Sequence, residues 1–126
     1  MLDTKTDLKS LLKDPSLLET RAYVAGEWIL ADDGATFEVI NPARGDVICT
    51  VPDLGRAETA RAIEAARVAM KDWAARTGKE RAQVMRKWFD LMMANQDDLG
   101  AILTAEMGKP LPEAKGEIAY GASFIE

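Results

Sequence analysis

The spacing of apolar residues changes at Gly55, and this change constrains the fold more than any other feature of the sequence. After Gly55, apolar side chains recur every three or four residues, which places them on one stripe of a helix: Ala60, Ile63, Ala66, Met70 and Trp73. Between Tyr23 and Gly55, β-branched and aromatic residues alternate with polar ones, as in strands with one covered face. The sequence therefore predicts an α+β chain in which small antiparallel β-hairpins precede about four helices.

Two segments have the pattern of β-hairpins. In YVAGEWIL, Gly26 interrupts the β-forming residues and allows a tight turn or a bulge. In TFEVINPARGDVICTV, two alternating runs flank residues 41–45, whose Asn, Pro and Gly favour a loop. Pro52 ends the second run because proline has no amide hydrogen to donate to a sheet.

Three further helices follow the one after Gly55. Thr77 stands three residues before Glu80, the spacing of a capping box, and predicts the start of the second helix. Gly108 predicts the end of the third helix, and Pro112 fits the first turn of the fourth. In the intact protein, the apolar stripes of the first two helices should be buried, either against one another or against a missing sheet. The stripes run through Ile63, Met70 and Trp73 and through Val84, Trp88 and Leu91.

The fourth helix has small residues on its inward face. Ala114 and Ala122 should pack inward with Ile118 and Ile125, while Gly116 and Gly121 should let a neighbouring element approach closely. Near the N-terminus, helical leucines precede Asp14 and Pro15. We therefore divide the chain into an N-terminal arm or short helix, residues 1–22, and a main region, residues 23–126.

Length and composition exclude several classes of protein. With 126 residues, the chain forms at most one domain, or part of one. A net charge of −5 with scattered basic residues argues against nucleic-acid binding. The absence of histidine and the single cysteine exclude histidine proton shuttles and cysteine–histidine zinc sites. No apolar run is long enough to span a membrane, and the charged first 18 residues do not resemble a signal peptide, so we expect a cytoplasmic protein.

The residues with reactive side chains do not form a recognisable catalytic motif. Cys49 lies on an alternating strand beside Val47 and Val51, which favours a small buried hydrophobic side chain over a nucleophile. The glycines fall in separate turns and form no nucleotide-binding loop. Two pairs of carboxylates are better explained by helix capping or solvation than by acid–base catalysis: Asp97 with Asp98, and Glu113 with Glu117. The three tryptophans are better explained by packing than by stacking on a ligand: Trp28, Trp73 and Trp88. We therefore assign no catalytic, cofactor-binding or metal-binding residue to this chain.

From Tyr23 onward the sequence resembles the N-terminal region of the aldehyde dehydrogenase superfamily, and most closely its succinate-semialdehyde dehydrogenase branch. The most diagnostic motifs are the Asn41-Pro42 turn with Gly45, TGKER from Thr77 to Arg81, EMGKP from Glu106 to Pro110, and EAKGEI running into YGASFIE. The resemblance implies an N-terminal fragment of the α/β aldehyde dehydrogenase fold. By this resemblance, residues 23–126 are the N-terminal part of the cofactor-binding domain and stop before its nucleotide and catalytic motifs.

The resemblance also implies an activity for the complete protein, the oxidation of succinic semialdehyde to succinate with NAD or NADP. Members of the family use a cysteine nucleophile, a general-base glutamate and an oxyanion-hole asparagine, all downstream of Glu126 in the comparison. Cys49 matches a strand position and not that nucleophile. We therefore expect this chain to be an inactive scaffold that binds no cofactor alone. Its partners would be the rest of its own polypeptide and, in the complete protein, further copies in a homo-oligomer.

Two points remain open at the level of sequence. Some family members hold a monovalent cation at positions that match the Val39 carbonyl and Glu106, although capping or solvation explains this glutamate more simply. The helices also present more apolar face than they can cover for one another, and the apolar pattern runs on to the acidic Glu126, so we expect a fragment of a longer protein. The alternative is a stand-alone interaction module that uses the exposed helix faces to bind another subunit.

Overall fold

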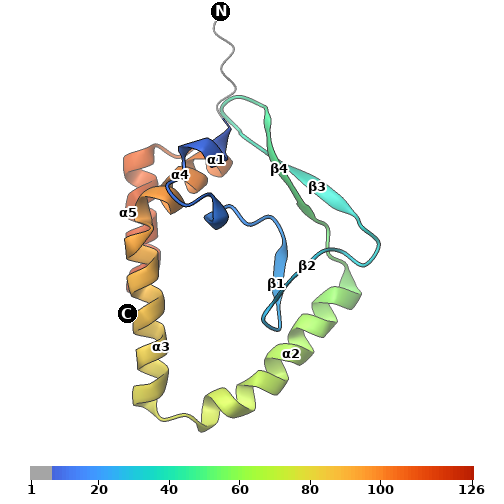
Figure 1. Cartoon of the computed structure of the whole chain (residues 1–126), viewed down its shortest axis with the longest axis vertical. Coiled ribbons are helices and arrows are strands. Elements are labelled where there is room, and N and C mark those ends of the chain that lie inside the picture. The colour runs from blue at the N-terminus through green and yellow to red at the C-terminus, as the bar shows by residue number, and fades with distance from the viewer. Residues whose placement is uncertain (1–6) are drawn as a thin grey trace, which may run out of the picture. The chain divides into compact units, whose positions relative to one another are not determined.

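The computed structural model describes residues 7–126 (Figure 1). The elements, in chain order, are α1 (Leu8–Leu11), a 3-10 helix (Pro15–Leu17), β1 (Ala22–Val24), β2 (Glu27–Ile29), β3 (Thr36–Ile40), β4 (Val47–Pro52), α2 (Arg56–Ala75), α3 (Gly78–Ala94), α4 (Gln96–Met107) and α5 (Leu111–Ser123). Two two-stranded antiparallel sheets followed by four main helices confirm the predicted α+β class. Within residues 7–126, no helix combines the length and apolarity needed to cross a bilayer.

The described chain divides into two compact units. The first unit contains residues 7–19, 40–48 and 85–126, and the second contains residues 20–39 and 49–84. Segments that are distant in the sequence therefore meet within each unit.

In the second unit, β1 and β2 form a tight hairpin. Tyr23 pairs with Trp28 across the strands, and their ring centroids are 4.8 Å apart. The turn residues Ala25 and Gly26 have φ angles of 54° and 89°. Two consecutive positive φ angles match the turn that suits the twist of a two-residue hairpin. The turn expected at Gly26 is thus confirmed.

A buried carboxylate ties the start of α2 to the segment after β2. Glu58 accepts a 3.1 Å hydrogen bond from the backbone N–H of Gly55, which caps the helix. Its other oxygen accepts a 3.0 Å bond from the backbone N–H of Asp32. These bonds, that from Asp32 foremost, lower the pKa of Glu58. Arg61 reinforces the contact through two 2.7 Å bonds to the Asp32 carboxylate.

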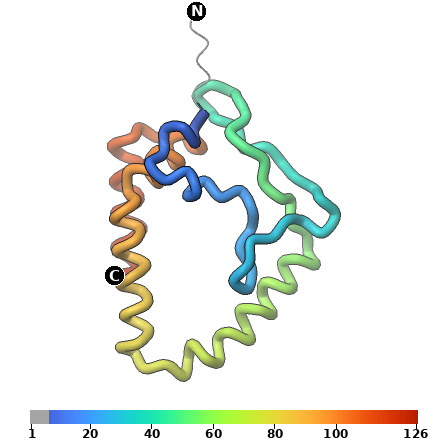
Figure 2. Tube along the Cα trace, in the orientation of Figure 1, coloured from blue at the N-terminus to red at the C-terminus, as the bar shows by residue number. Residues whose placement is uncertain are grey.

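In the first unit, α4 and α5 pack against each other; Figure 2 traces them at the orange and red end of the chain. Ala114 and Ala122 are fully buried, as the sequence predicted. The glycine at the close approach is Gly100, where an added Cβ would lie 2.9 Å from Lys115 Cγ. The expectation for Gly116 and Gly121 was wrong, because an added Cβ at either would meet no atom within 4 Å. Sequence spacing identified the helix but not its contact point.

The predicted helix ends are present. The side chain of Glu80 accepts a 2.7 Å bond from the backbone N–H of Thr77, and the Thr77 hydroxyl accepts from the backbone N–H of Glu80 at 3.3 Å. Gly108 ends α4 in the left-handed conformation with a φ of 78°. Pro112 lies in the first turn of α5. Local sequence therefore determines these boundaries.

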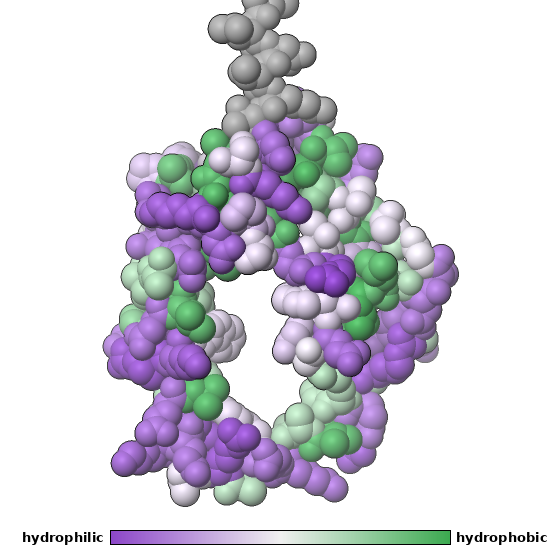
Figure 3. Space-filling model, viewed as in Figure 1, coloured by the Kyte–Doolittle hydropathy of each residue, from purple (hydrophilic) through white to green (hydrophobic). Residues whose placement is uncertain are grey.

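The apolar stripes of α2 and α3 are largely uncovered within residues 7–126, and their burial in the intact protein stays a prediction. Ile63 and Met70 are 66% and 60% exposed, while Trp73 is half-buried. On α3, Trp88 and Leu91 are each 54% exposed. The helical period was read correctly, but no described element covers either stripe. Figure 3 shows hydrophobic surface, in green, reaching the solvent between hydrophilic side chains along the helices.

Candidate functional site

Asp98 joins the N-terminal arm to α4 in the first unit. One carboxylate oxygen accepts a 3.0 Å hydrogen bond from the backbone N–H of Lys13, and the other accepts a 2.8 Å bond from that of Asp14. Asp98 is only 5% exposed. Two backbone donors are therefore satisfied by one buried side chain, and the arm is held beside the first turn of α4.

Asp97 adds a more exposed ion pair to this contact. Its carboxylate lies 2.9 Å from Lys13 Nζ and 2.8 Å from Lys115 Nζ. The hydrogen bond from Lys115, followed by that from Lys13, lowers the pKa of Asp97 to about 2. Asp97 thus links the arm, α4 and α5 electrostatically.

The loop between β3 and β4 is stabilised by its own side chains. Asn41 is buried, and its side-chain oxygen accepts bonds from the backbone N–H of Ala43 at 2.9 Å and of Arg44 at 3.3 Å. Arg44 donates through Nε and Nη2 to Asp46, at 3.0 and 3.1 Å. Such asparagine turns favour the loop conformation that the sequence predicted.

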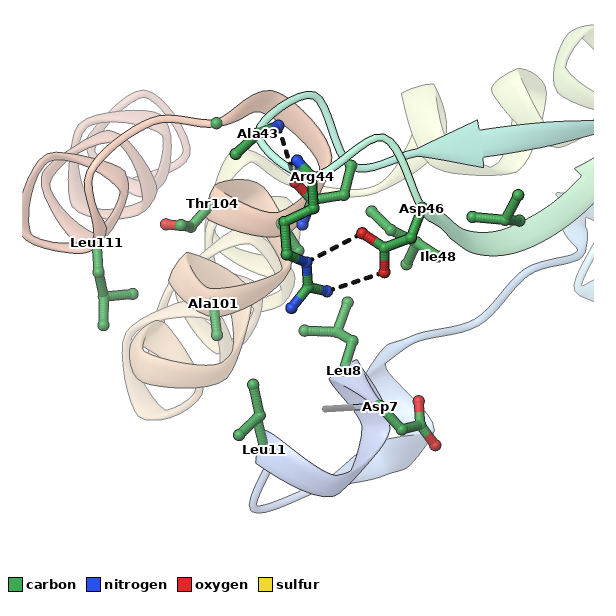
Figure 4. A pocket seen from close by; sticks show the side chains of 14 residues that line it. Asp7, Leu8, Leu11, Ala43, Arg44, Asp46, Ile48, Ala101, Thr104 and Leu111 are labelled. Carbon is green, nitrogen blue, oxygen red and sulfur yellow. Dashed lines mark hydrogen bonds and ion pairs between the residues drawn. The ribbon is translucent and has the colours of Figure 1, made fainter. Parts of the chain in front are cut away.

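A cavity of about 540 Å³ lies between this loop, α1 and the C-terminal part of α4. Its walls come from residues 7–11, 41–48 and 101–111, all in the first unit (Figure 4). Leu8, Leu11 and Ala101 face the cavity below the Arg44–Asp46 pair in this view. Thr104 belongs to the wall, and its buried hydroxyl has no hydrogen-bond partner among residues 7–126. The volume falls within the range of ligand pockets, roughly 300–1,000 Å³.

The structure assigns different roles to the two pairs of carboxylates considered in the sequence. Asp98 is neither solvated nor a simple helix cap, because its buried oxygens accept hydrogen bonds from the backbone of the distant N-terminal arm. Asp97 is exposed and paired with lysines. On α5, Glu113 and Glu117 are exposed, and Glu117 pairs with Lys109. Sequence spacing could not reveal the role of Asp98, because its partners lie 84 and 85 positions away.

The side chain of Cys49 on β4 is half-buried, less enclosed than the buried position expected for it. The tryptophans lie on three elements, and Trp28 and Trp88 are 48% and 54% exposed. Trp88 is therefore not buried among the described residues, and its core position in the intact protein stays a prediction, while Trp73 is half-buried. The Arg76 guanidinium lies 5.7 Å from the centroid of the Trp73 ring.

The two positions considered for a cation lie in different units. Val39 belongs to the second unit and Glu106, near the end of α4, to the first. Across residues 7–126 there is no group of three or more histidine, cysteine, aspartate or glutamate side chains that could hold a metal ion.

The described residues also do not fit a dinucleotide. A dinucleotide fold needs a strand leading through a glycine-rich turn into a helix N-terminus that receives the pyrophosphate. Here Gly55 precedes α2, but its N–H is bonded to the Glu58 carboxylate, which would repel a phosphate. The glycines with positive φ are Gly26, Gly34, Gly45 and Gly108, all in turns or at a helix end. We therefore assign no cofactor contact to residues 7–126.

Comparisons with known proteins place the chain in a family. The model of the aldehyde dehydrogenase family matches residues 28–126. The glutarate-semialdehyde dehydrogenase of Pseudomonas putida is 60% identical over 115 residues, which are 91% of this chain and 24% of that protein. The NADP-dependent succinate-semialdehyde dehydrogenase of Escherichia coli is 52% identical with the same coverage. The chain thus spans about a quarter of the length of these relatives.

Solved structures share the fold of the described chain. The crystal structure of succinate-semialdehyde dehydrogenase from Burkholderia pseudomallei matches with a TM-score of 0.88 and 63% identity, over 90% of this chain and 23% of that one. An aldehyde dehydrogenase from Brucella melitensis matches with a TM-score of 0.90 and 57% identity, over 91% of this chain and 24% of that one. The chain belongs to the aldehyde dehydrogenase family and corresponds to its N-terminal portion.

Proposed function

We propose that this chain is the N-terminal scaffold of an NAD- or NADP-dependent dehydrogenase that oxidises a short semialdehyde with a terminal carboxylate. The observation that carries the proposal is the 60% identity over 115 residues to a glutarate-semialdehyde dehydrogenase, together with 52% identity to a succinate-semialdehyde dehydrogenase. The substrates in the names of both relatives are aldehydes with a carboxylate at the other end. The two relatives thus agree on the chemical class.

Within this class, succinic semialdehyde is the substrate implied by the sequence resemblance, and glutaric semialdehyde is the second candidate. The Pseudomonas putida and Pseudomonas aeruginosa relatives named for glutarate semialdehyde are 60% and 59% identical to this chain, and the Burkholderia pseudomallei structure named for succinate semialdehyde is 63% identical, so identity does not rank the two substrates. A pocket that selects either one needs a cationic group to hold the carboxylate tail. The described residues do not define such a pocket, so the downstream portion of the enzyme would supply it.

The proposed role of residues 7–126 is structural. Oxidation of an aldehyde through a thioester needs an activated thiolate, and Cys49 lies on a strand in a chain that contains no histidine to act as its base. The cofactor would likewise bind to the downstream portion, and the chain alone would bind neither NAD nor NADP. For the complete enzyme we propose a cytoplasmic homo-oligomer.

The substrate class is tested on the complete enzyme that contains this chain, with reduced cofactor followed by absorbance. We expect higher kcat/KM for succinic and glutaric semialdehydes than for the neutral aldehydes butanal and pentanal, and equal values would overturn the assignment.

A chimera tests the scaffold role of this chain. The chain would be joined in register to the downstream portion of the Pseudomonas putida glutarate-semialdehyde dehydrogenase. We expect a kcat/KM for glutaric semialdehyde comparable to that of the parent Pseudomonas enzyme, assayed in parallel. A folded, soluble chimera that oxidises no semialdehyde would overturn the scaffold role.

A further inference from the structure

Asp33 is the one aspartate in the sequence that is followed by a glycine. In an Asp-Gly pair, the amide nitrogen of the glycine can reach the side-chain carboxyl carbon of the aspartate, because glycine has no side chain to block the approach. Asp33 and Gly34 are both exposed and lie between β2 and β3 in the second unit. The loop therefore holds a carboxyl group and a backbone nitrogen that can react with each other.

The side chain of Asp33 is turned towards the chain that follows it. Its Oδ1 accepts a 2.8 Å hydrogen bond from the backbone N–H of Ala35, two residues further on. An aspartate bonded in this way keeps its carboxyl group beside the intervening peptide, here that of Gly34. Among residues 7–126, no atom beyond the chain neighbours of Gly34 lies within 4 Å of the place where its Cβ would be. The space beside Gly34 is therefore open.

One hydrogen bond opposes the reaction. The backbone N–H of Gly34 donates to the carbonyl of Ala31 at 3.0 Å, and this bond must open before the nitrogen can attack. Backbone hydrogen bonds in exposed turns open at a much smaller free-energy cost than the whole fold does. The turn therefore slows the reaction without preventing it.

The reaction needs water and no other reagent. The Gly34 nitrogen attacks the carboxylic acid carbon of Asp33, a new C–N bond forms, and the carboxyl hydroxyl leaves with the amide proton as water. Water then adds to the backbone carbonyl carbon of Asp33 in the resulting five-membered succinimide and breaks the bond from this carbon to the Gly34 nitrogen. The product is an isoaspartate, in which the chain runs through Cβ and Cγ and the backbone carboxylate is free.

The loop is anchored on both sides of this peptide. Before it, the backbone N–H of Asp32 donates a 3.0 Å hydrogen bond to the buried Glu58 carboxylate at the start of α2. After it, the carbonyl of Ala35 accepts a 2.9 Å bond from the backbone N–H of Asp53. An isoaspartate lengthens the chain by one atom between these two anchors, so both bonds cannot keep their present geometry without strain elsewhere in the loop.

We propose that Asp33 is a site of spontaneous isoaspartate formation in the folded protein, and that the lengthened chain weakens the hydrogen bond from Asp32 to Glu58. The substrate is the protein's own Asp-Gly peptide, and water is the only co-reactant. The proposal depends on contacts within the second unit and is independent of the aldehyde that the enzyme oxidises.

Ageing of the complete enzyme that contains this chain tests the site. The enzyme would be held in warm neutral buffer, and isoaspartate at each aspartate would be measured by peptide mass spectrometry with electron-transfer fragmentation. Two exposed aspartates serve as internal controls, Asp32 before an aspartate and Asp90 before a leucine. A synthetic peptide of residues 28–38 gives the rate in the absence of the fold.

We expect isoaspartate to form at Asp33 at least about tenfold faster than at Asp32 or Asp90, and within about tenfold of its rate in the peptide. A smaller difference from the two control aspartates would overturn the proposal. A rate further below that of the peptide would also overturn it, because the turn would then block the attack.

Two variants test the succinimide route. Gly34→Ala adds a methyl group beside the attacking nitrogen and should slow the reaction, although the φ of 74° at this position strains an alanine. Asp33→Asn keeps the turn and loses ammonia in place of water, so it should give the same isoaspartate faster than the wild type does. A wild-type rate in folded Gly34→Ala would contradict the route, and so would a rate in Asp33→Asn no higher than in the wild type.

Hydrogen exchange tests the effect on the bond from Asp32 to Glu58. The backbone amide of Asp32 should exchange faster in aged enzyme that carries isoaspartate at position 33 than in fresh enzyme. Asp33→Glu is the matched control, because its longer side chain would have to close a less favourable six-membered ring. Unchanged exchange in isomerised wild type, or an equal increase in aged Asp33→Glu, would overturn the proposed weakening of this bond.

Discussion

The Asp98 carboxylate accepts a 2.8 Å hydrogen bond from the backbone N–H of Asp14, a residue 84 positions earlier in the chain. With the bond from Lys13 to the other oxygen, it secures the N-terminal arm to α4. Leu12 and Leu18 of this segment are 7% and 8% exposed, so the arm contributes to the core of the first unit. This contact makes the arm part of the fold.

Asp98→Ala should therefore destabilise the chain by about 1–3 kcal/mol, because two backbone donors lose their buried partner. Urea unfolding of the 126-residue chain measures this loss. The matched variant Asp97→Ala removes only exposed ion pairs, and we expect a smaller effect that decreases with added salt. Equal losses for the two variants would show that the backbone bonds to Asp98 do not hold the arm.

The pH dependence of stability should include a contribution from Asp97. Its pKa is lowered from 3.8 to about 2, so the folded protein binds this proton less readily than the unfolded chain. The stabilisation is thus fully present above the unfolded pKa and disappears as the pH falls through the folded value. Urea midpoints of wild type and Asp97→Asn should differ at pH 6 and converge near pH 2. A difference that stays constant across this range would contradict the ion pair.

Thr104→Val should leave stability unchanged or raise it by about 1 kcal/mol. The substitution preserves the shape of the side chain and removes a buried hydroxyl that has no partner among the described residues. Thermal unfolding of the chain alone measures the change. Ser123→Ala is the control, because the Ser123 hydroxyl donates to the Tyr120 carbonyl and should not give a gain. A clear loss of stability for Thr104→Val would mean that this hydroxyl has a partner.

Trp88→Ala should have different effects in the chain and in the chimera. In the chain alone, Trp88 is 54% exposed, and we expect a loss below about 1 kcal/mol, as for ordinary surface changes. If the downstream portion covers α3, the same substitution in the chimera should cost about 3–5 kcal/mol. Denaturant unfolding of both proteins gives the two values. A small loss of unfolding free energy in both proteins would indicate that the apolar stripe of α3 is uncovered in the chimera as well.

Local signals allowed the sequence to predict much of the fold. Capping by Thr77 and Glu80, and the end of α4 at Gly108, depend on residues within one turn of each other. The tie from Asp98 to the arm and the contact between Gly100 and Lys115 depend on how distant segments pack, which periodicity does not determine. Burial of the α2 and α3 stripes was inferred from apolar spacing, but spacing identifies a face and not what covers it.

The same distinction between local signals and contacts of distant segments applies to the candidate site. The Asn41 loop was predicted because asparagine and glycine favour turns, whereas the cavity beside it requires α1 and α4 to meet the loop in space. Because the sequence contains no histidine, histidine proton shuttles and cysteine–histidine zinc sites were excluded from the sequence alone. The family came from motifs such as EMGKP and is confirmed by the match over residues 28–126.

The proposed role of this chain is to support a dehydrogenase whose reacting groups lie in the downstream portion. The most direct measurement is the aldehyde-dependent formation of reduced cofactor by the chain, by the chimera, and by Cys49→Ser in each. We predict no turnover by the chain, turnover of succinic or glutaric semialdehyde by the chimera, and an unchanged chimera rate in Cys49→Ser. Turnover by the chain alone that Cys49→Ser abolishes would contradict the account and make Cys49 a nucleophile.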